Sequence, residues 1–204
     1  CEMAARAGVR QIVRLSVLNA GDERDPLAGW STAAENATKA SGIPWTFLRP
    51  GGFMSNTLGW AETIRRERKV RALFADQKVA WIDPYDIAAV AARALTEEGH
   101  TGRAYPLSGP RALSPREQAA TLAAALGAAI EVVDLPPSQV REALIAQGMP
   151  PEQADVVLAA RGTGASSLGM TVFPTVEQVT GRPPRSYAVW VQAHLDAFRE
   201  KPHP

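Results

Sequence analysis

The stretch "FLRPGGFMSN", residues 47–56, decides how this chain is interpreted. It continues the apolar, aromatic run that starts at "IPWT" (residues 43–46), and such a run is typical of a buried strand. Arg49 and Pro50-Gly51-Gly52 then interrupt it. Proline cannot donate to a strand ladder, and glycine leaves the backbone bare. The sequence therefore predicts a strand whose carboxyl end is either a simple turn or a backbone cleared for a bound molecule.

The segments around this stretch predict an α/β fold with an open, mostly parallel sheet. Residues 11–17, "QIVRLSV", form a β-branched run like that of a buried parallel strand, and residues 30–42 form an Ala-rich helix that ends at Gly42. Strand, helix and strand at this spacing make a βαβ unit. Downstream, the pattern predicts a helix from 57 to 70, a strand at 79–82, a helix from 83 to 99 and a strand at 103–110.

The pattern changes near Arg111, where a smaller and mostly helical lobe is predicted to begin. Ser114 and Glu117 have the spacing of a capping box, and Thr175 and Gln178 repeat it further on. We therefore expect two parts, residues 1–110 with the sheet and residues 111–204 as the lobe. Within the lobe the sequence predicts a helix at 114–127, a strand at 130–135, two helices separated near residue 149, a loop at 162–174, a short helix at 175–181 and a final helix at 185–200.

Composition excludes several classes of protein. The 204 residues are 46% hydrophobic with a net charge of +1, which favours a packed core and shows no basic cluster for nucleic acid. No apolar run is long enough for a membrane span. Cys1 is the single cysteine, so disulfides within the chain are excluded and a reducing, cytoplasmic compartment is expected. The three histidines are far apart, and no metal site is predicted.

The first residues, "CEMAARAG", read as a helix already under way that ends at Gly8. They lack the basic start and apolar stretch of a signal peptide. We therefore expect the chain to be a fragment that lacks an N-terminal part.

Candidate ligand-facing residues lie at the predicted strand ends. In an open parallel sheet, ligands bind beyond the carboxyl ends of the strands, where Ser16 and the Pro50 to Phe53 segment fall. Each also has a simpler interpretation, as a strand-end serine or a turn. Arg49 is expected to pair with a carboxylate, and Trp60 to belong to the core or to a pocket wall. Asp83 and Asp86 are explained as helix-capping residues. "RGTGASSLG" (residues 161–169) resembles a phosphate loop but follows a helix, so it is treated as a linker.

Several longer segments resemble the NmrA-like family of atypical short-chain dehydrogenases/reductases, which bind NAD(P). They are "GVRQIVRLSVLNAG", "ASGIPWTFLRPGGFMSN", "WIDPYDIAAVAARALTEEGHTGRAYPLSGP", "LSPREQAATLAAALG" and "VEQVTGRPPRSYAVWV", in that order. The resemblance covers nearly the whole chain. It implies a partial Rossmann-like, doubly wound sheet with a small C-terminal lobe over a cleft. It also implies that the glycine-rich loop and the residues that choose NADP or NAD lie upstream, so we expect weak or no cofactor affinity for these residues alone.

The resemblance further implies which residues face the cofactor or the substrate. The segment matching "RLSVLNAG" runs past the nicotinamide, and the one matching "RPGGFMSN" lies near the nicotinamide or the substrate. The candidates carried over are Ser16, Val17, Pro50, Gly51, Phe53 and Asn56.

The Tyr-x-x-x-Lys pair of typical short-chain reductases is missing. Ser31 and Glu35 stand at that spacing, and Lys39 lies one turn further on. Serine is a poor general acid, and glutamate cannot replace lysine. One hypothesis is a reductase that passes hydride from NADP or NAD to a small planar or conjugated acceptor such as a quinone or azo dye. A second is an NAD(P)-binding redox sensor without turnover, and a third is a scaffold that has lost cofactor binding. The catalytic residues and the oligomeric state are left open.

Overall fold

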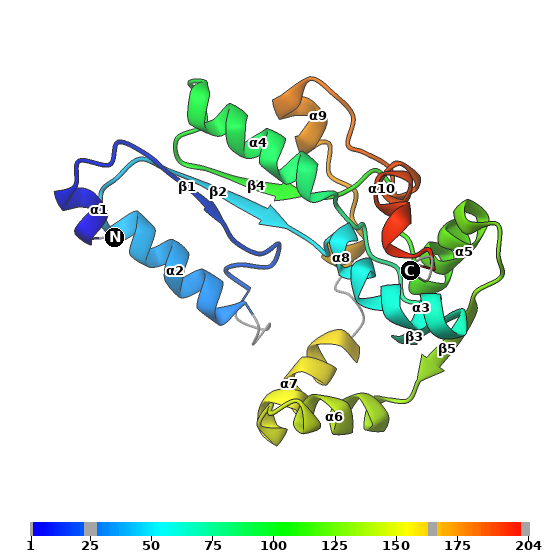
Figure 1. The fold of residues 1–204 in the computed structure, drawn as a ribbon. Helices are drawn as coiled ribbons and strands as arrows, with labels where there is room; N and C mark the ends of the chain where they lie inside the picture. The colour runs from blue at the N-terminus through cyan, green and yellow to red at the C-terminus, as the bar shows by residue number, and fades with distance from the viewer. Residues whose placement is uncertain (1, 23–27, 163–166, 201–204) are drawn as a thin grey trace.

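A computed structural model describes residues 2–22, 28–162 and 167–200, and its α/β architecture is the one expected (Figure 1). β1 (Ile12–Leu15), β2 (Trp45–Pro50) and β4 (Arg103–Leu107) form a parallel sheet in the order β1-β2-β4. α2 (Gly29–Ala40) joins β1 to β2, and α4 (Pro84–Thr96) covers the opposite face of the sheet (Figure 1). This layering confirms the strand–helix–strand prediction and the Rossmann-like class.

β2 is the central strand, paired with β1 on one side and β4 on the other, and both of its faces are covered. Thr46 and Phe47 are fully buried and Leu48 is 2% exposed, as expected for a parallel strand with helices on both sides. Asp83 caps α4, since its Oδ1 accepts a hydrogen bond of 2.9 Å from the Tyr85 N–H. The capping interpretation of Asp83 is thus confirmed.

A second, two-stranded sheet is the main departure from the expected fold. The predicted helix over residues 57–70 is replaced by a 3-10 helix, η1 (Met54–Trp60), and a short helix, α3 (Ala61–Glu67). Arg68 then adopts a left-handed conformation (φ 54°) and starts β3 (Lys69–Leu73), which pairs in parallel with β5 (Glu131–Leu135). The single long helix was wrong because Val70, fully buried, pairs with Val132 in this sheet.

The strand predicted at residues 79–82 was also wrong. Within the described part of the chain, this segment makes isolated bridges, Val79 with Leu113 and Ile82 with Phe53, instead of joining a sheet. Its backbone hydrogen bonds are divided among several separate segments, with Val79 bonded to Leu113, Ala80 to Gly169 and Ile82 to Gly52.

The rest of the lobe is helical, as expected. Ser114 and Glu117 form the predicted capping box at the start of α5 (Pro115–Leu126). The capping box predicted at Thr175 and Gln178 was wrong, because Thr175 is already the first residue of α9 (Thr175–Thr180) and the capping position is Pro174, whose side chain has no hydrogen-bonding group. The final helix ends at His194 and passes into a 3-10 turn, earlier than predicted. The remaining elements are α1 (Glu2–Arg6), α5 (Pro115–Leu126), α6 (Pro137–Ala146), α7 (Pro151–Gly162), α8 (Ser167–Met170), α9 (Thr175–Thr180), α10 (Tyr187–His194) and η2 (Leu195–Ala197).

Two clusters of buried apolar side chains hold the molecule together. One lies between the sheet, α4 and α9, and is centred on Leu48, Val90 and Leu107. The larger one joins the η1–α3–β3 segment to α5 and α10, and it includes Ile64 and Trp190. This larger cluster takes side chains from both sides of residue 110, so residues between 54 and 75 pack on the same core as α5 and α10.

Candidate active-site cleft

The carboxyl ends of β1, β2 and β4 meet at one edge of the sheet. The Ser16 N–H donates to the Leu48 carbonyl at 2.7 Å, and the Gly51 N–H donates to the Leu107 carbonyl at 3.1 Å. The Leu18 N–H extends the pairing by bonding the Pro50 carbonyl at 3.0 Å. The strand-end residues singled out in the sequence are therefore neighbours in space.

A cleft of about 880 Å³ opens at this edge. Four of the predicted site residues line it, namely Val17, Pro50, Gly51 and Asn56. Ser16 and Phe53 do not: Ser16 is 6% exposed, and Phe53 is bridged to Ile82 and packs against the core. The rest of the lining is Leu18, Asn19, Gly52, Thr57, Trp60, Arg71, Ala72, Leu73, Phe74, Gln77, Val79, Trp81, Pro115, Gln118 and Gly169.

Ser16 belongs to a buried polar network just behind the cleft. Its Oγ donates to Glu35 Oε1 at 2.6 Å, and Arg49 donates to the same carboxylate from Nε (2.9 Å) and Nη2 (2.6 Å). Burial of Glu35 by itself raises the pKa of the carboxyl, but the hydrogen bonds from Arg49 and Ser16 outweigh it and the pKa is lowered. Glu35 is therefore an ionised carboxylate that already accepts three hydrogen bonds.

The two adjacent glycines have different roles. A Cβ on Gly52 would lie 2.6 Å from the Trp81 ring, so this position is bare because the indole packs on it. A Cβ on Gly51 would meet no atom closer than 3.7 Å and would face the cleft. Position 52 therefore lacks a side chain because Trp81 occupies the space, whereas position 51 has room beside it for a ligand.

The opposite wall comes from the loop after β3 and from α5. Phe74 has a left-handed backbone (φ 55°), which is unusual for a residue with a bulky side chain. The loop is held because the Ala75 N–H donates to Asp134 Oδ1 at 3.2 Å, and the Ala75 carbonyl accepts from the Arg116 N–H at 3.0 Å. The loop is thus tied both to β5 and to the first turn of α5.

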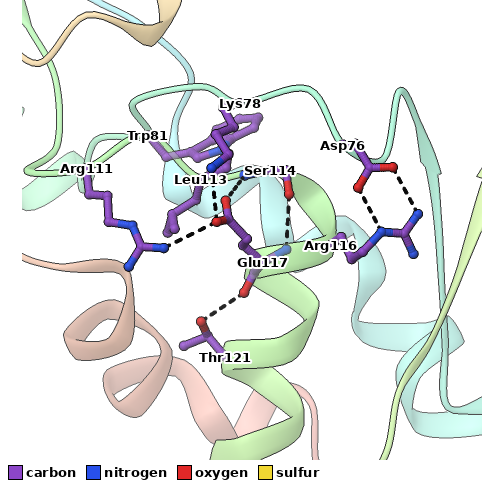
Figure 2. A network of polar contacts seen from close by, with 9 residues as sticks. All are labelled: Asp76, Lys78, Trp81, Arg111, Leu113, Ser114, Arg116, Glu117 and Thr121. Carbon is purple, nitrogen blue, oxygen red and sulfur yellow. Dashed lines mark hydrogen bonds and ion pairs between the residues drawn. The ribbon is translucent and has the colours of Figure 1, made fainter.

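A polar network fixes the first turn of α5 and the indole beside it (Figure 2). Glu117 accepts from the Ser114 N–H at 2.8 Å and pairs with Lys78 at 3.3 Å. Trp81 Nε1 donates to the Leu113 carbonyl at 2.8 Å, and Arg116 pairs with Asp76. These bonds hold one aromatic wall of the cleft in place, and none of them was visible in the sequence beyond the capping box.

The cleft has one ionisable side chain, Arg71, among its described lining residues. Its polar lining also includes Gln118, which is 1% exposed and whose Nε2 has no hydrogen-bond partner among the described residues. Sequence reasoning missed both. Arg71 follows the helix predicted over residues 57–70 and was given no role, and a glutamine in the second turn of an amphipathic helix carries no signal of its own.

Other candidates contribute less. Residues 163–166 of "RGTGASSLG" lie outside the described residues, but Gly169 lines the cleft and its carbonyl accepts from the Ala80 N–H at 2.9 Å. In the described part of the chain, no group of three or more metal-ligating side chains comes together. None of its helices has the length and hydropathy needed to cross a membrane.

Comparisons with known proteins relate the chain to NAD(P)H-binding proteins. Residues 1–98 match a family described as NAD(P)H-binding. The chain is 44% identical to (4-alkanoyl-5-oxo-2,5-dihydrofuran-3-yl)methyl phosphate reductase of Streptomyces griseus, over 96% of this chain and 70% of the relative. It is 38% identical to an NAD(P)H azoreductase of Xenophilus azovorans, over 96% of this chain and 68% of the relative.

A solved structure shows the same fold. The NADPH-dependent quinone oxidoreductase of Escherichia coli, determined in complex with NADPH, superimposes with a TM-score of 0.79 and 31% identity. The match covers 95% of this chain and 69% of that chain.

Proposed function

The chain belongs to the NAD(P)H-binding, NmrA-like family of atypical short-chain dehydrogenases/reductases, and from that premise we propose that it transfers hydride from NAD(P)H to a small conjugated acceptor such as a quinone. The observation that carries this proposal is the cleft itself. It lies at the carboxyl ends of parallel strands, where this class of fold binds dinucleotides, and Trp60 and Trp81 line it.

The sheet side of the cleft suits the cofactor. Val17, Pro50 and Gly51 line this side of the cavity, and none of them has a long or charged side chain, so a planar nicotinamide ring could lie against them. Asn56 lines the same cavity and offers an amide that can bond a ring carboxamide or a substrate oxygen. The cofactor would supply the hydride, and these residues would orient it.

The buried network explains which acceptors fit. The Ser16 hydroxyl donates into Glu35, and Glu35 is held ionised, so neither group has a proton to give to a substrate. Hydride transfer to a quinone produces a delocalised hydroquinone anion that water can protonate. An acceptor of this kind does not require the Tyr-x-x-x-Lys pair that this chain lacks. Relatives that act on azo compounds, quinones and an unsaturated lactone phosphate support the same class.

The test uses the full-length protein to which these residues belong, and the oxidation of NAD(P)H by menadione is followed by NAD(P)H absorbance. We expect turnover, and we expect Trp60→Ala to lower kcat/KM about tenfold through lost stacking area. Trp30→Ala is the matched control, because Trp30 is 90% exposed and lies outside the cleft. NAD(P)H binding without oxidation by menadione or an azo dye would overturn the proposal in favour of a redox sensor. Failure to bind NAD(P)H would leave a scaffold.

A further inference from the structure

The wall formed by β3 and α5 is chemically different from the rest of the cleft. Arg71 lies on β3, and Gln118 lies in the second turn of α5. The bond between the Arg116 N–H and the Ala75 carbonyl ties these two elements together. A positive charge and an amide therefore line the same wall of a cavity whose other described lining residues carry no charge.

Gln118 is unusual because it is polar, 1% exposed and incompletely bonded. A buried donor without a partner costs about 1–3 kcal/mol relative to one that is satisfied. Ala119 and Leu122, its neighbours on α5, belong to the apolar core, where a leucine would suit position 118 equally well. An unpaired N–H donor in a cavity wall can be satisfied by a hydrogen bond to an oxygen atom of a bound ligand.

Arg71 supplies charge but is not wholly committed to its partner. Its Nη2 lies 2.6 Å from Glu67 Oε2, and its side chain is 41% exposed. A guanidinium has five N–H donors, so one contact to Glu67 leaves others for an oxyanion. Glu67 is also a competitor, because its negative charge weakens the binding of an anion to the same arginine.

We propose that this wall is a subsite for an oxyanion group of the acceptor, such as a sulfonate, carboxylate or phosphate. Arg71 provides the charge, and the Gln118 amide provides a hydrogen bond to the bound acceptor. The substrate class that follows is a conjugated carbonyl compound with an anionic substituent. This inference deepens the proposed reductase function and rests on it for the identity of the conjugated part.

The experiment measures binding rather than turnover. Quenching of tryptophan fluorescence is titrated with naphthoquinone and with naphthoquinone sulfonate, and the ratio of the two dissociation constants is the readout. We expect the chain to bind the sulfonate more tightly. We expect Arg71→Ala to lower this preference about fivefold, a modest effect because the site is partly exposed, and added salt to lower it as well. Glu67→Gln is expected to raise the preference.

Arg66→Ala is the matched control, because Arg66 makes the same kind of exposed i,i+4 pair, with Glu62, outside the cleft. Gln118→Leu provides a second signature. This substitution should weaken binding of the sulfonate and leave the melting temperature unchanged or higher. If Gln118 had a purely structural role, the substitution would lower the melting temperature.

The outcomes separate the two proposals. The subsite would be overturned by equal affinity for the two quinones or by no binding of either. It would also be overturned if Arg71→Ala and Arg66→Ala gave the same ratio of the two dissociation constants. Selective binding of the sulfonate with no NAD(P)H oxidation would support the subsite and refute the reductase.

Discussion

Replacing Glu35 with glutamine should destabilise the protein by about 2 kcal/mol. The carboxylate accepts three hydrogen bonds, a buried one from Ser16 Oγ and two from the charged guanidinium of Arg49. The amide retains one acceptor oxygen and turns an NH2 group toward donors, so at least one bond to a charged group is lost, worth about 1.5–3 kcal/mol. Arg49 is 24% exposed and recovers some hydration, which places the expected loss below the top of that range.

The assay is urea unfolding followed by circular dichroism at about pH 7 and again at acid pH. A loss of about 2 kcal/mol lowers the midpoint by about 1 M urea. Because the folded pKa of Glu35 lies below its ordinary value of 4.5, its contribution is complete above that value and disappears as the pH falls through the folded pKa. The difference between wild type and Glu35→Gln should therefore shrink below pH 4.5.

Two comparisons make the reasoning refutable. Glu62→Gln removes a carboxylate from an exposed pair with Arg66 and should change stability by less than about 0.5 kcal/mol. The double variant Glu35→Leu/Arg49→Met removes both buried partners and should be more stable than Glu35→Leu alone. A Glu35→Gln variant as stable as Glu62→Gln, or a stability gap that does not narrow in acid, would refute the account of the network.

Two further predictions concern packing and capping. Gly52→Ala places a methyl group 2.6 Å from the Trp81 ring and should lower the free energy of unfolding, measured by thermal unfolding, by about 1–3 kcal/mol. The control is Gly59→Ala, where the added methyl group has no atom within 4 Å and should be neutral or slightly stabilising. Equal melting temperatures of the two variants would contradict the packing role of Gly52. Ser114→Ala removes the hydroxyl that accepts a hydrogen bond from the Glu117 N–H and should lower the free energy of unfolding by about 1 kcal/mol, and Ser114→Asp should restore most of that stability. An alanine variant as stable as the wild type would show that water caps the helix as well as the serine does.

The sequence predicted the sheet around residues 11–50 well because local and long-range preferences agree there. β-branched and aromatic residues, the turn at Gly42 and the proline at residue 50 all favour the same structure. The helix predicted here forms over Ala61–Glu67, but its predicted end at residues 68–70 failed for the opposite reason. "AETIRRERKV" is a good helix former throughout, and the strand begins where it does because Val70 gains more from pairing with Val132, far along the chain, than from another helical turn.

The residues of the candidate cleft also fall into two groups, those that sequence patterns indicated and those that they did not. Pro50 and Gly51 were placed at the cleft by the position of strand ends, whereas Val17 and Asn56, which also line it, were named only through the family resemblance. Arg49 was correctly expected to bond a carboxylate, although its partner, Glu35, was considered only as a replacement for the missing lysine. Arg71 and Gln118 could not be found, because their position depends on the β3–β5 pairing, which no local pattern indicates.

The larger core cluster has a consequence for how the chain can be divided. Ile64 and Val70 come from the first part of the sequence, and Leu122 and Trp190 from the last, yet they fill one interior. A cut at residue 110 would therefore split a hydrophobic core instead of releasing two independent modules. The loop after β3 and the first turn of α5, which form one wall of the cleft, rest on this shared interior, so mutations that reshape that wall should also change the stability of segments from both ends of the chain.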